Sequence, residues 1–224
     1  MAEITASARV FQRRADDYDA WFDRNPLMFA AEVRALRELL DPVLEEKPAA
    51  TGLEIGVGSG RFAEQLGLEH GVDPAPRMVS LARSRGIWAV EGRAESLPFG
   101  DSRFDITAII TTLCFVDDAD ASLREARRVT AEGGVLLLAY LDADGPGAER
   151  LTGGAGHDSF YAKARLRDGA EIRALLESHG FVVDDSRQVI DDEGVPVVRP
   201  GVDEGLFCAV RAVARPRHEE RNVS

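Results

Sequence analysis

Three glycines at alternate positions, Gly56, Gly58 and Gly60, follow directly on an apolar run at residues 52–55. A helix-like segment at residues 61–66 comes next. Glycine is favoured where the backbone turns sharply or passes close to a ligand, because it has no Cβ. A helix that begins there presents free N–H groups and the positive end of its dipole. The pattern therefore predicts a strand, a tight turn and a helix, with the turn placed to bind a ligand at the carboxyl end of the strand.

Short apolar runs alternate with helix-like segments through residues 51–141. The runs are nearly continuous in apolar residues, which is typical of parallel strands that are buried on both faces. Five strands are predicted here, at residues 52–55, 69–73, 88–91, 104–110 and 135–141. Helices are predicted between them at residues 61–66, 76–85 and 119–130. The alternation indicates a parallel sheet with helices on both faces.

Residues 4–47 are helical in pattern and rich in aromatic side chains. The pair Asn25-Pro26 predicts a break into two helices, because the residue before a proline disfavours helical backbone. One apolar stripe in the second helix is suited to packing on a sheet, and its members are Phe29, Val33, Leu36, Leu40 and Leu44.

The last third of the chain begins with a glycine- and aspartate-rich segment at residues 142–160, which is long enough to form a loop or a lid over a site. A helix is predicted at residues 168–179, with Gly180 at its C-terminal cap. Two strand-like runs at residues 181–190 and 205–214 predict a hairpin. The charged tail that follows is predicted to fray.

Composition limits the partners and the compartment. The chain has 27 basic and 39 acidic residues, a formal charge of −12, so a phosphate backbone would be repelled and nucleic acid is a poor candidate partner. No apolar run approaches the roughly 20 residues that a membrane helix needs, and Met1-Ala2-Glu3 begins no secretory signal. The two cysteines, Cys114 and Cys208, predict no disulfide framework and favour a reducing cytoplasm.

An acidic residue follows the glycine turn at the end of the next predicted strand. Asp73 lies thirteen residues beyond Gly60 and can accept hydrogen bonds from both hydroxyls of a ribose. The turn and the acid together predict an adenosine-type ligand across the strand ends. A dinucleotide fingerprint would place its third glycine at Arg61, whereas here the third glycine is Gly60 and Glu54 precedes the motif. The spacing therefore disfavours a nicotinamide cofactor.

This Gly-x-Gly-x-Gly pattern resembles the first motif of the class I S-adenosylmethionine-dependent methyltransferases. The resemblance continues through residues 73–78, 92–99 with Asp101 and Phe104-Asp105, 111–116 and 128–134, and it covers residues 11–211. It is closest to the small-molecule branch that includes the quinone-biosynthesis methyltransferases. Arg93 departs from the pattern, because many members carry aspartate there.

The resemblance implies a set of cofactor-binding residues. The glycine loop would border the methionine part of S-adenosylmethionine, Asp73 would bind the ribose, and the loop at residues 93–95 would hold adenine. The residue matching Thr111 would lie beside the reacting methyl group, and Tyr18 would belong to a lid. The full predicted set is Tyr18, Glu54, Gly56, Gly58, Gly60, Asp73, Pro74, Met78, Ala94, Glu95 and Thr111.

Several of these residues have a structural alternative. Glu54 fits a partnered structural carboxylate as well as a group that orients the cofactor's ammonium. Met78 fits plain core packing as well as contact with adenosine. Tyr18 and Trp21 share a helix face, which suits packing on a sheet edge as well as a lid over the methyl site. Cys114 reads as a small buried hydrophobic residue.

No metal or catalytic pair is expected. The four histidines form no ligand cluster by spacing, and they are His70, His157, His179 and His218. Of these, His157 in the long loop is the one placed to reach a substrate. The catalytic residues are left open, since methyl transfer from an activated sulfonium depends largely on positioning the acceptor and excluding water.

The expected function is methyl transfer from S-adenosylmethionine to a small-molecule acceptor. The alternatives are a non-catalytic S-adenosylmethionine-binding regulatory protein and, on weaker grounds, a NAD-dependent oxidoreductase; a protein or RNA methyltransferase is a further variant.

The resemblance predicts a doubly wound, mostly parallel, seven-stranded α/β sheet with one antiparallel strand near the C-terminus. One domain is predicted over residues 1–224. It comprises a helical cap (1–47), a cofactor-binding core (48–141), a loop or lid (142–160), a C-terminal helix and strand hairpin (161–215) and a frayed tail (216–224). The cap and the loop would cover the carboxyl ends of the strands and shape the acceptor pocket.

Overall fold

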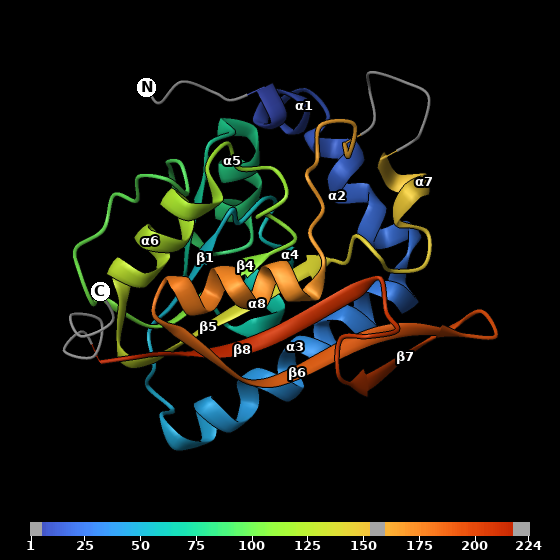
Figure 1. Cartoon of the computed structure of the whole chain (residues 1–224). Coiled ribbons are helices and arrows are strands. Elements are labelled where there is room, and N and C mark those ends of the chain that lie inside the picture. The colour runs from blue at the N-terminus through green and yellow to red at the C-terminus, as the bar shows by residue number, and fades with distance from the viewer. Residues whose placement is uncertain (1–5, 153–159, 217–224) are drawn as a thin grey trace.

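The structure is a computed structural model that describes residues 6–152 and 160–216 (Figure 1). Its centre is one sheet in the order β3-β2-β1-β4-β5-β8-β6-β7. The strands are β1 (Gly52–Ile55), β2 (His70–Asp73), β3 (Trp88–Glu91), β4 (Phe104–Ile110), β5 (Thr130–Leu141), β6 (Phe181–Asp192), β7 (Val195–Pro200) and β8 (Phe207–Ala214). The helices are α1 (Ala6–Arg13), α2 (Ala15–Arg24), α3 (Pro26–Glu46), α4 (Arg61–Leu66), α5 (Pro76–Ser84), α6 (Ala119–Val129), α7 (Ala148–Thr152) and α8 (Gly169–Ser178).

The first five strands pair in parallel, and the sheet reverses its winding at β1. From β1, the chain moves outward through β2 to β3, then returns to place β4 on the other side of β1 and β5 beyond it. β8 lies antiparallel between β5 and β6. The predicted doubly wound, mostly parallel sheet with an antiparallel strand near the C-terminus is therefore confirmed. The winding reversal places a crevice at the carboxyl ends of β1 and β4, where sheets of this kind bind ligands.

The sheet has eight described strands, so the prediction of seven was wrong. The additional strand is β7, which pairs antiparallel with β6 alone and forms an edge of the sheet. Its sequence contains Pro196 and Pro200. Proline cannot donate a ladder hydrogen bond, so it argues against a central strand but is tolerated at an edge. The strand was not predicted because of its two prolines, which are compatible with a strand only at the edge of the sheet.

The N-terminal segment forms three helices in the described residues rather than two. Asn25 ends α2 and Pro26 begins α3, so the predicted break there is confirmed. A second break separates α1 from α2 at Arg14, whose φ of −118° and ψ of 31° are not helical. No proline or glycine marks this bend in the sequence, which explains why it was missed.

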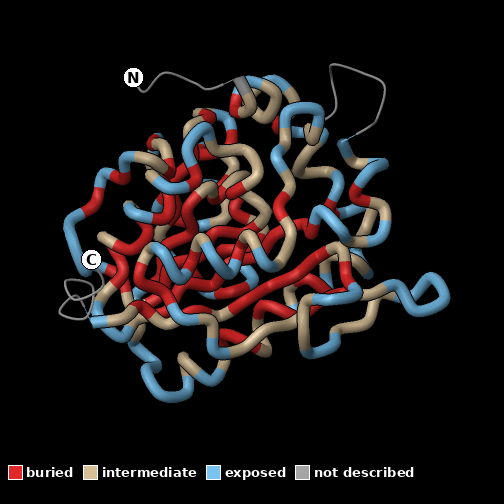
Figure 2. Tube along the Cα trace, in the orientation of Figure 1, coloured by how far each residue is buried: buried red, intermediate tan, exposed pale blue. Residues whose placement is uncertain are grey.

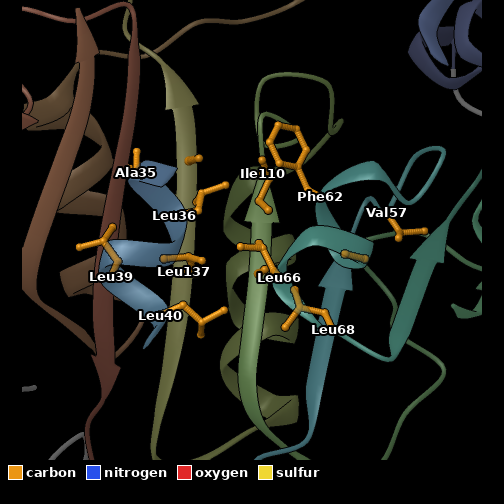
Figure 3. Packing of buried hydrophobic residues seen from close by; sticks show 14 of the residues in the cluster. Ala35, Leu36, Leu39, Leu40, Val57, Phe62, Leu66, Leu68, Ile110 and Leu137 are labelled. Carbon is orange, nitrogen blue, oxygen red and sulfur yellow. The ribbon is translucent and has the colours of Figure 1, made fainter. Parts of the chain in front are cut away.

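Two apolar layers sandwich the sheet. Along β5, Leu137 faces the layer that contains α3, α4 and α5, whereas Leu136 and Leu138 face the layer that contains α6 and α8. This alternation follows from the two-residue period of a strand. Figure 2 shows the buried residues concentrated along the sheet, and Figure 3 shows Leu137 beside Leu36 and Leu39 of α3.

Smaller differences lie at the ends of elements. β5 begins five residues earlier than predicted, and the segment at residues 142–160 contains the short helix α7. Residues 153–159 of the predicted lid, which include His157, and the tail beyond residue 216 lie outside the described residues. Trp88 on the edge strand β3 is 56% exposed. Across the ranges that the structure describes, no helix is long and apolar enough to cross a membrane.

Candidate cofactor site at the carboxyl edge of the sheet

The glycine turn after β1 takes a left-handed path that only glycine adopts easily. Gly56, Gly58 and Gly60 have φ values of 77°, 52° and 84°. A Cβ on Gly56 would lie 2.2 Å from Cγ2 of Thr112, which follows β4. The Gly56 and Val57 amides both donate to the Val72 carbonyl of β2, at 2.8 and 3.0 Å. These contacts hold the turn across the ends of β2 and β4.

Asp73 ends β2 directly beneath this turn. Its Oδ2 accepts a hydrogen bond from the Gly58 amide at 3.0 Å, and its Oδ1 accepts one from the Ala75 amide at 2.8 Å. Burial raises the pKa of Asp73 to about 6, and the Ala75 and Gly58 amides oppose part of that rise. Each oxygen retains a further lone pair, so the carboxylate can accept two more hydrogen bonds from one ligand.

A cavity of about 700 Å³, counting its open mouth, lies over this edge of the sheet. Its floor comes from the ends of the first four strands, the loops that follow them and the start of α5, and its roof comes from α1 and α2. The lining residues are Ala8, Phe11, Tyr18, Gly56, Gly58, Val72, Asp73, Pro74, Met78, Gly92, Arg93, Ala94, Glu95, Thr111, Thr112, Phe115 and Val116.

The cavity brings together all but two of the residues that the sequence predicted. Glu54 is buried behind the glycine turn, and one of its carboxyl oxygens has no hydrogen-bond partner in the described chain. Gly60 faces α5, where a Cβ would lie 2.9 Å from the Cα of Ala82. Gly60 thus allows α4 and α5 to approach, and it does not line the cavity.

Burial governs the chemistry of Glu54. Burial raises the pKa of Glu54 well above its usual range, a hydrogen bond from the Ala63 amide opposes the rise, and the nearby charge of Asp73 adds to it. Met78 was predicted either to pack in the core or to line the site. It does both, because it is 1% exposed and forms part of the cavity wall.

The loop after β3 carries an internal ion pair. Arg93 contacts Glu95 at 3.3 Å and Asp117 at 2.7 Å, and the Asp117 amide donates to Glu95 at 3.0 Å. Burial alone would raise the pKa of Glu95, but the hydrogen bond from Arg93 holds it below its usual value. Glu95 is therefore an ionised group on the cavity wall whose charge Arg93 already offsets.

The roof is tied to the helices below it by ion pairs. Asp19 of α2 contacts Arg61 of α4 at 2.9 Å and Arg85 at 2.8 Å, and these three side chains are each less than one-fifth exposed. Arg61 also pairs with Asp23. Arg61 occupies the third-glycine position of a dinucleotide fingerprint, so in this chain that position holds the roof in place.

Aromatic rings close the inner side of the roof. Phe11 packs edge-on against both Tyr18 and Phe115, with ring centroids 5.4 and 5.0 Å apart. Phe160 lies 5.8 Å from Tyr18, and Tyr161 lies 5.5 Å from Phe115. Tyr18 is therefore in a position to cover the cavity, as the lid prediction requires. Trp21 contacts Phe22, is 37% exposed and is not part of the cavity wall.

Sequence reasoning missed several wall residues. Phe115 and Thr112 fall within the segment 111–116 that carried the resemblance, so that segment was the available signal. Phe11 and Ala8 had no signal beyond a general helical pattern, because their position depends on how α1 folds over the sheet.

The remaining titratable candidates lie elsewhere. His70 contacts the Gly52 carbonyl and the rings of Trp88 and Phe104, and His179 contacts the Leu175 carbonyl. Cys114 was predicted to be buried and is half-buried in the structure; desolvation raises the pKa of its thiol to about 12, so the thiol is neutral. Among the residues described, no group of histidine, cysteine and carboxylate side chains could hold a metal ion.

Comparison with known proteins decides the family. Residues 53–138 match the family described as a methyltransferase domain. A Thermotoga maritima structure, named a SAM-dependent methyltransferase and possible histamine N-methyltransferase, superposes with a TM-score of 0.84 at 32% identity, covering 93% of this chain and all of that one. This chain belongs to the class I S-adenosylmethionine-dependent methyltransferases. Its cofactor is S-adenosylmethionine.

Two further relatives of this methyltransferase differ in how much of the chain they cover. An uncharacterized protein of Methanocaldococcus jannaschii is 33% identical over 207 residues, which are 91% of this chain and 98% of that protein. The ubiquinone/menaquinone biosynthesis C-methyltransferase UbiE of Stenotrophomonas maltophilia is 34% identical over 154 residues, which are 61% of this chain and 60% of that protein.

The geometry of the site fits the cofactor of the methyltransferase family. Gly56 and Gly58 leave open a cradle that side chains would narrow, since a Cβ on Gly58 would lie 3.5 Å from the Tyr18 ring. Asp73 offers free acceptor lone pairs at the centre of the cavity wall. Apolar contact for a purine is available from Met78 and Ala94.

Proposed function

We propose that this protein transfers the methyl group of S-adenosylmethionine to a small-molecule acceptor. The observation that carries the proposal is the roof: Ala8, Phe11 and Tyr18 line the cavity, so helices α1 and α2 cover part of the site and leave it an open mouth. A partly covered, concave cavity suits an acceptor that enters whole, in contrast to the open surface that a folded macromolecule needs. The charge of −12 also disfavours RNA as the acceptor.

Each part of the cavity then has a proposed role toward the cofactor. Asp73 accepts hydrogen bonds from both ribose hydroxyls, because both of its oxygens retain lone pairs. Gly56 and Gly58 border the methionine part, and Pro74, Met78, Ala94 and Glu95 surround the adenosine. Thr111 lies toward the methyl end. Glu54 and Gly60 act indirectly, by supporting the glycine turn and by packing α4 on α5.

The bound cofactor supplies a methyl group on a positively charged sulfur, which is a good leaving group. The protein's own residues position the two reactants and exclude water from them. The glycine turn and Asp73 fix one reactant against the sheet, while the rings of Phe11, Tyr18 and Phe115 exclude water from the other side. Holding two reactants in line can account for much of the acceleration of such a transfer.

The test is a thermal-shift titration after stripping of copurified ligand, with S-adenosylmethionine, S-adenosylhomocysteine and NADH in parallel. At 100-fold excess over the dissociation constant, linkage gives about 2.7 kcal/mol, a rise in Tm of about 5–10 °C for a chain of this size. We expect the rise with the two sulfur ligands and none with NADH. A panel of small acceptors then tests turnover. Cofactor binding without methyl transfer to any acceptor would instead favour the non-catalytic regulatory protein.

A further inference from the structure

A second, smaller cavity lies beside the cofactor cavity. It measures about 230 Å³, counting its open mouth, and its walls come from the loop after β4, the end of β5, the segment before α8 and α8 itself. Thr111 lines both cavities, so the two meet at the end of β4. A methyl acceptor has to lie against the cofactor, and the second cavity is therefore placed to take the part of the acceptor that does not react.

Thr111, the residue shared by the two cavities, has an unusual backbone conformation. Its φ is 47°, a left-handed value that a β-branched residue seldom adopts. Its amide donates to the Ala139 carbonyl of β5 at 2.8 Å, which holds the turn in place. Beyond Thr111 the loop serves both cavities, since Phe115 lines the cofactor cavity and Leu113 lines the second one. Strained residues of this kind concentrate at functional sites, and here the strain lies on the shared wall.

The charges on the wall of the second cavity are positive. Arg165 and Arg167 line it, and no described carboxylate does. Both arginines contact one carboxylate behind the wall, since Oε1 of Glu171 on α8 lies 2.9 Å from Arg165 and 3.1 Å from Arg167. Two guanidinium groups thus share one carboxylate in the described chain, and this cluster of three side chains keeps a net positive charge.

Arg167 is the buried member of the pair. It is 7% exposed, its Nη1 donates to the Leu113 carbonyl at 3.1 Å, and its Nε donates to Glu171. Across residues 6–152 and 160–216, its Nη2 has no hydrogen-bond partner. A buried donor without an acceptor is costly, so this position favours a ligand that brings a negatively charged oxygen.

A carboxylate matches these donors. A guanidinium group is planar and pairs with both oxygens of a carboxylate. Much of the remaining wall is apolar, including Leu113, Leu141 and Ile172, and suits the carbon atoms next to such a group. A basic nitrogen in the same place would meet two positive charges.

We propose that the methyl acceptor is a small carboxylic acid, whose carboxylate is bound by Arg165 and Arg167 in the second cavity while its reacting atom lies past Thr111, against the cofactor. The inference rests on the proposed methyl transfer. The carboxylate anchors the acceptor and is not itself methylated. The two arginines bind and orient the acceptor and take no part in making or breaking a bond.

The test uses the full chain saturated with S-adenosylhomocysteine and a panel of small acids, each paired with its primary amide. Such pairs are 3-mercaptopropanoate with 3-mercaptopropanamide and 3-aminobenzoate with 3-aminobenzamide. Calorimetry measures binding. When S-adenosylmethionine replaces the product, mass spectrometry measures methyl transfer and locates the methyl group. We expect the acids that are methylated to bind at least about tenfold more tightly than their amides, because charge-assisted hydrogen bonds are the stronger ones.

Two variants test the arginines. Arg165→Gln removes a charge from an exposed side chain, and Arg167→Lys keeps the charge but loses the planar pair of donors. We expect each to weaken acid binding about tenfold and to leave amide binding unchanged. The control is Lys163→Gln, which removes the same charge from an exposed residue of the same segment that does not line the cavity. It should change acid binding by less than about twofold.

The outcomes separate this inference from the proposed function. Methyl transfer to neutral acceptors, with acids bound no more tightly than their amides, would overturn the acid assignment and leave methyl transfer standing. A methyl ester as the product would overturn the anchoring role of the carboxylate. Acid binding that survives both arginine variants would overturn the role of the arginines, and retained S-adenosylhomocysteine binding shows that these variants are folded. Failure of every acceptor, charged or neutral, despite cofactor binding would overturn the proposed function itself.

Discussion

The floor and the roof of the cavity are built by different means. The floor consists of strand ends and the glycine turn, fixed by backbone hydrogen bonds such as Gly56 and Val57 to Val72 and by contacts too close for a Cβ. The roof consists of α1 and α2. Ion pairs of Asp19 tie α2 to Arg61 of α4 and to Arg85 after α5, and edge-on aromatic contacts join α1 to α2. Close backbone packing does not depend on salt, whereas an ion pair weakens as salt screens it, although less so where the pair is partly buried, as here. The comparison teaches that the floor depends on backbone packing, whereas the roof depends on contacts between side chains.

The largest expected effect lies in the floor. Asp73→Asn removes the charge that would accept both ribose hydroxyls but keeps the size of the side chain. Hydrogen bonds to a charged group contribute about 1.5–3 kcal/mol each, so we expect S-adenosylhomocysteine to bind at least about 100-fold more weakly by calorimetry. Asp41→Asn, on the exposed side of α3, is the control. Binding that stays within twofold would show that Asp73 has no part in holding the cofactor.

A second floor prediction compares two left-handed glycines. Gly56→Ala meets Thr112 at 2.2 Å, whereas Gly67→Ala has nothing within 4 Å, and both have φ near +70° to +77°. The backbone strain is shared, at about 1 kcal/mol. We expect Gly67→Ala to lose about 1 kcal/mol of unfolding free energy and Gly56→Ala about 2–4 kcal/mol, since overpacking adds its own cost. Equal losses in denaturant titrations would mean that the floor is not closely packed.

The pH dependence of cofactor binding follows from Asp73, whose pKa burial raises to about 6. The carboxylate form accepts the ribose hydroxyls, so affinity should be constant above about pH 7 and fall as the group is protonated through its pKa of about 6. The limiting slope is about tenfold per pH unit, measured as Kd for S-adenosylhomocysteine between pH 5 and pH 8. Asp73→Asn should flatten this profile. An affinity that rises on acidification would contradict the assignment.

The smallest expected effect lies in the roof. Asp19 pairs with Arg61 and Arg85, and although burial opposes it, these hydrogen bonds lower the pKa of Asp19 to about 2. Asp19→Asn should speed dissociation of S-adenosylhomocysteine about fivefold, because a partly buried ion pair contributes about 1 kcal/mol. High salt should speed dissociation from the wild type in the same direction. Asp16→Asn removes a much more exposed pair with Arg77 and should change little.

The sequence predicts the floor well and the roof poorly, for a physical reason. Gly56, Gly58 and Asp73 belong to a local strand–turn–helix pattern whose geometry follows from a few neighbouring residues. Phe11 and Phe115 are in contact because α1 folds back over the end of β4. The residues near each phenylalanine in the sequence do not predict this long-range contact. β7 was missed for a related reason, since its prolines are acceptable only at an edge that tertiary structure creates.

The helix α3 shows the same division within one element. The predicted stripe is correct at Leu36 and Leu40, which are buried. Glu32 was not part of it, because a carboxylate in a helical pattern reads as solvent-facing. Tertiary packing nevertheless buries this position, and Glu32 is only 8% exposed.

The positions of the tryptophans make the protein's own fluorescence usable as a probe of the roof. Only two tryptophans are present, Trp88 on the edge strand β3 and Trp21 on α2, one turn after Tyr18. Replacing Trp88 with phenylalanine would leave Trp21, on the roof and in contact with Phe22, as the single tryptophan. Its fluorescence would then report any change around α2 when a ligand binds, without an attached dye.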